Sequence, residues 1–331
     1  MTLLAPTLQS FFTTYLTGQK AASRHTIAAY RDTWRLLLTY LNTHQNRQPA
    51  GIDFADLSAD TITAFLTHLE TDRHNSVPTR NARLAAIHAL FRYAAFLHPE
   101  HADLIARVLA IAPKNTARPL ISYLSDAEVD VLLSAPPLSR WVGRRDRLIM
   151  LTLITTGLRV SELTSLTWAD LQLSRPAHTV CHGKGRKDRV TPLNPDTCRD
   201  LLAWQLESRN PAPAQAVFTS QGTRRPLTVD AVEQRIRIHA ATAALTCPSL
   251  VEKTITPHVL RHTTAMRMLA AGIDVATISL CLGHESIDST SAYLHADSSI
   301  KQRALDRTAL PETIPGRYIP PDATLEFLEN L

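Results

Sequence analysis

The sequence predicts a mainly α-helical protein of two domains, with one small antiparallel β-sheet in the second domain. Three observations support this fold class. Apolar residues recur at helical spacing along most of the 331 residues. A polar stretch bounded by prolines, 113–119, interrupts that pattern and has the composition of a linker. One further segment, 179–192, has the pattern of a β-hairpin instead.

Residues 1–113 are expected to form a helical first domain. Apolar spacing over 8–16 predicts its first helix, and Ser23 and Ser58 are placed to cap the next two. Pro78 opens a fourth, long helix. This last helix carries three basic residues, which form either a solubilising face or a face that contacts DNA. They are Arg80, Arg83 and Arg92.

The linker, 114–124, contains Lys114 and Arg118, and the second domain, 125–310, follows it. Ser125 and Glu128 have the spacing of a capping box at the first helix of this domain. An apolar helix over 147–155 should stop at Gly157. After the hairpin, helices resume at Thr197, Thr228 and Thr256. The tail, 311–331, has an apolar side that could dock in cis or on a neighbouring subunit; its residues are Leu325, Phe327, Leu328 and Leu331.

The hydrophobic content of 44% supports a packed core, and the net charge of +5 is compatible with a nucleic-acid partner. Three basic clusters in the second domain strengthen that interpretation, although each alone is more often a solvated face. They are Arg144, Arg145 and Arg147; Lys184, Arg186, Lys187 and Arg189; and Arg224 and Arg225. The four cysteines include no CxxC pair, and no leader or long apolar run is present. We therefore expect a cytoplasmic protein without membrane contact.

A phosphate site is the main chemical prediction. Thr256 and Pro257 start a helix, so His258 lies in its first turn, where the helix dipole favours an anion. Arg261 follows one turn later on the same face. His262 stands four residues after His258, a spacing that is also found in zinc sites. The glutamate of HExxH and a third ligand are absent, so we expect His262 to be a buried hydrogen-bonding residue and expect no metal.

Three other segments contribute chemistry. Arg159 follows the glycine break and has Glu162 three residues later, either as a surface ion pair or as a held arginine with an orienting carboxylate. Lys184 lies between two glycines at the hairpin tip; the ordinary interpretation is a solvated basic loop, because the P-loop spacing is missing. Tyr293 follows His284 by nine residues, and its phenol, with a pKa of about 10, needs a base and cations to act as a nucleophile.

Five elements in order resemble the signature of the tyrosine recombinases, the phage-integrase and Xer-like family. They are Gly157-Leu158-Arg159, Gly183-Lys184-Gly185, His258-x-x-Arg261-His262, Leu282-Gly283-His284 and Tyr293. The first domain is similar to the core-binding domain of that family, so the likeness spans nearly the whole chain. The segment from His284 to Asp297 looks most like integrases of mobile elements.

The resemblance implies a site-specific recombinase that cuts and rejoins DNA through a 3′-phosphotyrosyl link. Tyr293 would attack the phosphate, and Arg159 and Arg261 would bind its non-bridging oxygens. Lys184 would protonate the departing 5′-oxygen, His258 would act as acid or base, and His284 would hydrogen-bond the phosphate. No cofactor is implied.

The resemblance also implies double-stranded DNA as the partner and a tetramer on DNA, with or without a second recombinase. Two other functions are compatible with these residues. A type IB topoisomerase shares the chemistry and relaxes DNA alone, but the helical first domain disfavours it. A DNA-binding regulator could keep the fold without cleaving; the presence of all the catalytic residue types disfavours that alternative.

Overall fold

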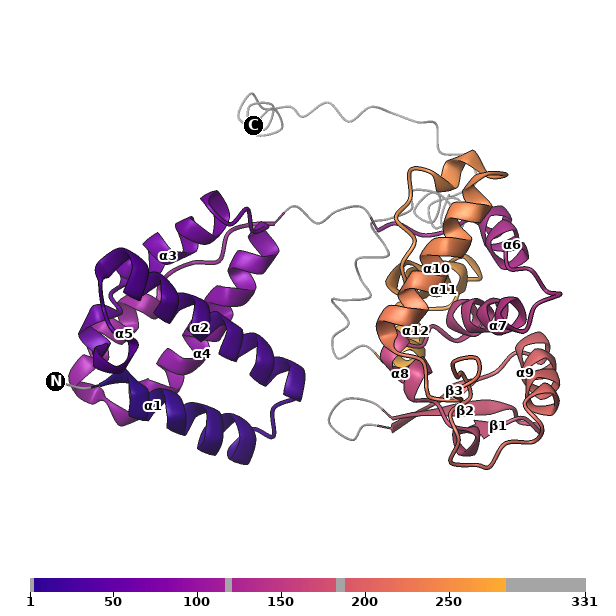
Figure 1. Ribbon diagram of the computed structural model, residues 1–331, viewed down its shortest axis with the longest axis horizontal. Helices are drawn as coiled ribbons and strands as arrows, with labels where there is room; N and C mark the ends of the chain where they lie inside the picture. Colours follow the sequence, from indigo (N-terminus) through magenta and orange to yellow (C-terminus); the bar gives the residue numbers. More distant parts are fainter. Residues whose placement is uncertain (1–2, 117–120, 183–187, 284–331) are drawn as a thin grey trace, which may run out of the picture. The chain divides into compact units, whose positions relative to one another are not determined.

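The computed structural model describes residues 3–116, 121–182 and 188–283 of the chain. Within these ranges the protein is mostly helical with a single small sheet, as predicted (Figure 1). The chain divides into two compact units, Met1–Pro119 and Leu120–Leu331. The division falls inside the segment predicted to be the linker.

The first unit is helical throughout its described residues. Its longer elements are α1 (Leu4–Ser10), which continues into the π-helix η1 (Phe11–Gln19), α2 (Arg24–Gln45), α3 (Ala59–Thr71), α4 (Val77–Leu97) and α5 (Ala102–Leu109). Short 3-10 turns lie at Pro49–Gly51, Phe54–Asp56 and Pro99–His101. Ser23 and Ser58 accept hydrogen bonds from the backbone N–H groups of Thr26 and Thr61, which confirms both predicted caps.

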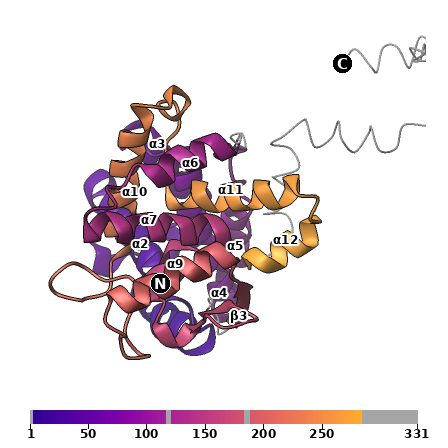
Figure 2. The same ribbon diagram turned by 90° about the vertical axis from the view of Figure 1, so that its right-hand side faces the viewer.

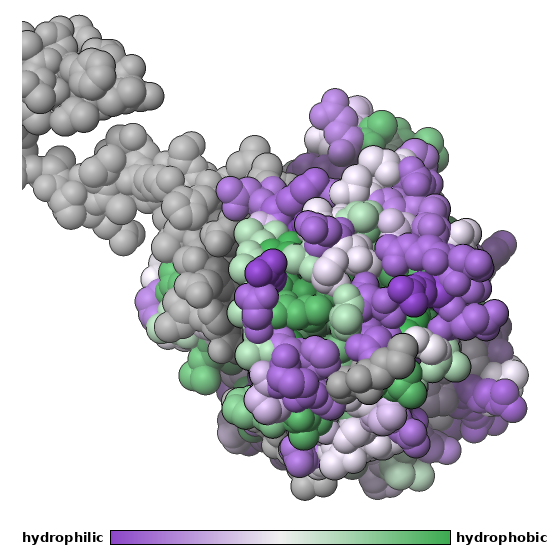
Figure 3. Space-filling view, turned by 90° about the vertical axis from the view of Figure 1, so that its left-hand side faces the viewer, coloured by the Kyte–Doolittle hydropathy of each residue, from purple (hydrophilic) through white to green (hydrophobic). Residues whose placement is uncertain are grey.

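Helix α4 organises the first unit, because α2, α3 and α5 all pack against it. The shared core is rich in aromatic side chains, including Phe11, Trp34, Phe54, Phe65 and Phe91. Figure 3, which looks from the side of this unit, shows hydrophobic residues grouped in the middle of the face and hydrophilic residues around them. Single exposed apolar residues are normal on such a surface.

The second unit begins with α6 (Asp126–Ser134), α7 (Trp141–Thr156) and α8 (Val160–Ser165), followed by the 3-10 turn η5 (Trp168–Asp170). The sheet comprises β1 (Leu171–Gln172), β2 (His178–His182) and β3 (Asp188–Pro192). The remaining described elements are α9 (Pro195–Glu207), α10 (Val229–Ala244), the 3-10 turn η6 (Pro248–Leu250), α11 (Pro257–Ala270) and α12 (Val275–Leu282). The sheet is antiparallel, in the order β1-β2-β3.

Helix α7 is the centre of this unit. It packs against α6, α8, α9, α10 and α11, and ten of its sixteen residues are buried (Figures 1 and 2). A helix that is apolar on all sides is usually a buried helix, which explains the apolar run that the sequence shows there. Its burial fixes where its C-terminal end lies, and that end forms one wall of the site described below.

The helix ends follow the sequence closely. Ser125 and Glu128 form the predicted capping box, and Thr228 and Thr256 cap α10 and α11. Helix α9 begins earlier than predicted, because Asn194 caps it. Gly157 ends α7 in the left-handed conformation, at φ 64°, as predicted.

Gly157 is also a point of close approach. A Cβ atom built on it would lie 2.3 Å from Cδ2 of Leu282, at the end of α12. We predict that Gly157→Ala lowers the free energy of unfolding by roughly 2–4 kcal/mol, combining a left-handed conformation with overpacking. Urea denaturation followed by circular dichroism would measure the loss.

Gly222→Ala is the matched control for this change. Gly222 also has a positive φ, 84°, but nothing lies within 4 Å of its added Cβ. Gly222→Ala should lower the free energy of unfolding by about 1 kcal/mol, from backbone strain alone. Equal losses in the two variants would show that the contact between Gly157 and Leu282 does not matter.

Candidate active site

The candidate site lies where the C-terminal ends of α7 and α12 meet the first turns of α8 and α11. Both α7 and α12 end at a left-handed glycine, Gly157 at φ 64° and Gly283 at φ 66°. The last carbonyl groups of a helix have no partner within the helix and carry the negative end of its dipole. Two such ends therefore offer a set of acceptors suited to cationic side chains.

Arg261 donates hydrogen bonds to carbonyl groups at both helix ends. It is only 3% exposed, and its two terminal nitrogens donate to the carbonyl oxygens of Gly157 and Leu282, each at 2.6 Å. Buried guanidinium groups require such partners, because an unpaired buried charge is costly. The backbone thus fixes the Arg261 guanidinium relative to α7 and α12.

Arg159 lies beside it at the start of α8. Its Nη2 donates to the carbonyl oxygen of Gly283 at 2.6 Å, and its Nη1 donates to Glu162 at 2.9 Å. The carboxylate also accepts the backbone N–H of Arg159 at 2.8 Å. The Arg159 side chain is 41% exposed, whereas Glu162 is 7% exposed. The prediction of a held arginine therefore describes this pair better than a loose surface ion pair does.

Glu162 is shared between two arginines. Both terminal nitrogens of Arg189, on β3, donate to its two carboxylate oxygens at 2.7 Å. Burial by itself would raise the pKa of Glu162, but the hydrogen bonds from Arg189 and Arg159 outweigh burial and lower it to about 2. The carboxylate is therefore ionised at any pH near neutrality.

His258 lies in the first turn of α11, one turn before Arg261. Although its side chain reaches solvent, partial burial against the protein lowers the pKa of His258, and the positive charges of Arg261 and Arg159 lower it further. A neutral imidazole can accept a proton. His262 is half-buried rather than buried as expected, and its ring packs edge-on against that of His258, with centroids 4.1 Å apart.

The hairpin presents Arg189 in an unexpected direction. Arg189 pairs with Cys181 across the strands, and this pair shares the inner face with buried Thr191. Val190 lies on the outer face and is 60% exposed. Arg189 was predicted to contact DNA from a solvated hairpin, whereas its guanidinium is engaged with Glu162 inside the unit.

Several predicted site residues lie outside the described part of the chain. They are Lys184, Arg186 and Lys187 at the hairpin tip, Arg118 in the linker, and His284 and Tyr293 after α12. The apolar tail residues lie outside it as well. The described residues nevertheless lead directly to two of these segments, since His182 and Asp188 pair at the hairpin base and Gly283 ends α12.

The basic residues predicted on α4 separate into different environments. Arg80 is buried and donates to the carbonyl oxygen of Ala112 at 3.3 Å. Arg83 bridges to α2 through the carbonyl oxygen of Ala29 at 3.1 Å. These two side chains tie the unit together, and Arg92 alone of the three is exposed. Lys114 is exposed and forms a 2.8 Å ion pair with Glu70.

The basic cluster on α7 is not a free cationic surface. Arg144 pairs with Glu207 at 2.6 Å and Arg147 with Asp200 at 2.8 Å. Arg145 is buried and donates two hydrogen bonds to Asp146. Carboxylates from α9 and from α7 itself pair with all three arginines, and the expectation that this cluster adds to a DNA surface stays a prediction. Arg224 and Arg225 are exposed.

The acceptors that hold the arginines could not be predicted from residue types, because they are backbone carbonyls of Gly157, Leu282 and Gly283. The two helix-ending glycines were the available signal. The inward direction of Arg189 was missed as well. Only the register of the strand pair reveals it, since the alternation Arg-Val-Thr ordinarily places the valine inside.

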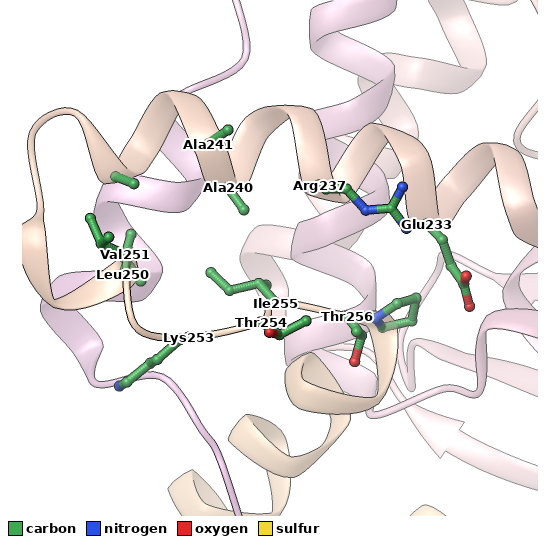
Figure 4. A pocket seen from close by; sticks show the side chains of 12 residues that line it. Glu233, Arg237, Ala240, Ala241, Leu250, Val251, Lys253, Thr254, Ile255 and Thr256 are labelled. Atoms are coloured by element: carbon green, nitrogen blue, oxygen red, sulfur yellow. The ribbon is translucent and has the colours of Figure 1, made fainter. Parts of the chain in front are cut away.

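A groove of ≈ 430 Å³ lies behind the start of α11. Ala240 and Ala241 of α10 lie on one side of it and Ile255 on the other, with Thr256 at one end (Figure 4). Lys253, which also lines it, donates to Glu128 at 2.7 Å and so ties this segment to the start of α6. The groove thus borders the residues that cap α11 but contains none of the predicted catalytic side chains.

Two further properties concern the described residues only. They contain no group of three or more histidine, cysteine, aspartate or glutamate side chains that could hold a metal ion. No helix among them has both the length and the apolar character needed to cross a membrane.

Comparison with known proteins agrees with this architecture. Residues 122–299 match the model of the phage integrase family, and residues 10–96 match the phage integrase N-terminal SAM-like domain. The chain is 43% identical over 328 residues to a putative integrase/recombinase, y4rC, of Sinorhizobium fredii, covering 99% of this chain and 98% of the relative. It is 31% identical over 283 residues to the tyrosine recombinase XerD of Pseudomonas putida, covering 84% and 88%.

Solved structures share the fold. The XerH site-specific recombinase bound to a palindromic difH substrate aligns with a TM-score of 0.65 at 21% identity, covering 88% of this chain and 82% of that one. A lambda integrase dimer bound to a COC′ core site aligns with a TM-score of 0.64 at 17% identity, covering 95% and 99%. The chain belongs to the phage integrase family and is a tyrosine-type site-specific DNA recombinase.

Proposed function

We propose that this recombinase cuts and rejoins duplex DNA through a 3′-phosphotyrosyl intermediate on Tyr293, without a metal ion or a nucleotide. The observation that carries the proposal is the pair of guanidinium groups held side by side by consecutive carbonyls. Arg261 is bound to Leu282 and Arg159 to Gly283, with His258 one turn from Arg261. Two fixed cations next to a neutral imidazole suit a phosphate whose charge increases during reaction.

The proposed reaction exchanges one phosphoester for another. The phenol oxygen of Tyr293 forms a bond to phosphorus, and the bond from phosphorus to the 5′-oxygen breaks. His258, which its lowered pKa keeps in the neutral form, takes the phenol proton, and Lys184 gives a proton to the departing oxygen. Arg159 and Arg261 bind the non-bridging oxygens, and His284 hydrogen-bonds the phosphate. A 5′-hydroxyl from another strand then reverses the step without ATP.

We further propose double-stranded DNA as the substrate and a tetramer on DNA as the active assembly, with or without a second recombinase. The structural relatives include a recombinase bound to its difH site, a lambda integrase dimer on a core site and the Tn1549 transposon integrase on transposon DNA. The last of these is compatible with a mobile-element role. We also propose that the protein acts in the cytoplasm.

Tyr293→Phe should abolish the covalent DNA adduct and leave DNA binding nearly unchanged, because only the attacking oxygen is removed. A nicked suicide substrate traps the adduct, which denaturing electrophoresis detects, and a mobility shift measures binding. Tyr318→Phe is the control and should form adduct normally. An adduct that persists in Tyr293→Phe and disappears in the control would move the nucleophile to Tyr318.

Arg159→Ala and Arg261→Ala should each slow cleavage by roughly 10²–10³-fold, as the loss of one donor to a developing oxyanion does. Lysine at either position should rescue poorly, because it lacks the planar fork. Arg261→Ala should also lower the melting temperature more than Arg159→Ala, since it leaves two buried carbonyls without their donor.

Single-turnover cleavage and thermal melting measure these two effects separately. Arg144→Ala, which removes an arginine paired on the surface with Glu207, is the matched control and should cleave normally. A lysine variant at position 159 or 261 with near-normal cleavage would rule out a clamp that depends on the guanidinium fork.

Lys184→Ala should slow cleavage of a normal phosphodiester but have much less effect on a substrate with a 5′-bridging sulfur. Sulfur leaves without a proton, so a general acid becomes dispensable. Rates on the two substrates, measured side by side, test this role. Equal losses on both would mean that Lys184 binds DNA and does not donate a proton.

A further inference from the structure

Arg189 is committed to the interior of the second unit. Its side chain is 14% exposed, and its Nη1 and Nη2 form a fork on the two oxygens of Glu162, both at 2.7 Å. Such a parallel pair of bonds is the strongest geometry that an arginine and a carboxylate adopt. The guanidinium of Arg189 therefore points at Glu162 and is largely shielded from solvent.

The charges at this junction add up in a specific way. Arg159 and Arg189 each carry one positive charge, and Glu162 carries one negative charge that touches both. Arg189 bonds to both oxygens of the carboxylate, and the Arg159 side chain donates to it through Nη1 alone while its Nη2 donates to Gly283. The three side chains together carry a net charge of +1, and Arg159 is the more exposed of the two arginines.

Arg189 also supports the other partner of Arg159. A Cβ built on Gly283 would lie 2.9 Å from Nη1 and 3.0 Å from Cδ of Arg189, so the Gly283 turn rests directly on this side chain. Arg189 therefore contacts both groups that hold Arg159, namely the Glu162 carboxylate and the turn that supplies the Gly283 carbonyl.

We propose that Arg189 is a positioning residue for phosphate binding, which offsets the charge of Glu162 and thereby leaves the positive charge of Arg159 available to the scissile phosphate. The inference rests on the proposed role of Arg159. Removing one member of a buried ion pair leaves an uncompensated charge. Without Arg189 that charge is the Glu162 carboxylate, 2.9 Å from Arg159, and it would compete with the phosphate for the guanidinium.

A double-mutant cycle tests this inference, with four proteins: wild type, Arg189→Gln, Glu162→Gln and the double variant. Each is assayed for single-turnover adduct formation at saturating DNA, for DNA affinity and for melting temperature. We expect Arg189→Gln to cleave about 10–100-fold more slowly with nearly unchanged affinity, since the loss of charge compensation affects Arg159 and not docking. Glu162→Gln in the same chain should restore at least part of the rate, because it removes the competing charge.

Three outcomes would overturn the inference. Losses that multiply in the double variant would mean that the two residues act independently. If Arg189→Gln instead weakens DNA affinity and reduces the salt dependence of binding, Arg189 contacts DNA phosphates. Arg189→Lys gives a second readout, since it keeps the charge and should cleave faster than Arg189→Gln. If Arg189→Lys and Arg189→Gln both melt like the wild type and cleave at equal rates, the proposal is also contradicted.

The design remains decisive if Arg189→Gln does not fold. The double variant has no uncompensated buried carboxylate, so it should then fold and cleave, and a double variant that is also unfolded would reduce Arg189 to a structural role. Arg159→Ala separates this inference from the proposed function. If Arg159→Ala cleaves normally, the proposed function is wrong; if it is impaired while Arg189→Gln is normal, only the role of Arg189 is wrong.

Discussion

The carbonyl groups at the ends of α7 and α12 hold both arginines of the candidate site, and much of the second unit serves to bring these two ends together. Helix α7 is fixed by burial against five neighbouring helices. Helix α12 packs on α11, so its end reaches the end of α7. Glycine at both ends permits the left-handed turn, and at Gly157 it also leaves room for Leu282. The fold thus turns unpaired helix carbonyls into acceptors for guanidinium groups.

The electrostatics of the site follow from the same arrangement. The partners of Arg261 are neutral backbone carbonyls, and Arg159 shares the Glu162 carboxylate with Arg189. Positive charge is therefore concentrated and oriented, and the one negative charge among the groups that hold it, that of Glu162, is shared with Arg189. A fixed arrangement of this kind needs little reorganisation when charge develops on a bound phosphate.

Much of the fold could be predicted because its signals are local. Ser23, Ser58, Ser125 and Thr256 cap helices by bonds to the residue three positions away, and Gly157 ends a helix through its own backbone. The spacing of His258 and Arg261 placed both on one helix for the same reason.

The directions of individual arginines could not be predicted, since they depend on residues distant in sequence. Arg144 forms an ion pair with Glu207 on another helix, and Arg83 donates a hydrogen bond to the backbone of α2. The strand register directs Arg189 inward. A basic cluster in a sequence therefore indicates charge but not whether that charge remains available. The outward position of Val190 illustrates the same limit, because hydrophobicity alone would have reversed the strand.

The use of main-chain acceptors has a consequence for how this site tolerates sequence change over evolution. A carbonyl belongs to whatever residue occupies the position, so no side-chain replacement at 157, 282 or 283 can delete it. A substitution can disturb these backbone acceptors only by moving the main chain, so the two glycines and the helices behind them are the positions where a replacement would matter most. Glu162 is the exception among the partners of the two arginines, because it acts through its side chain.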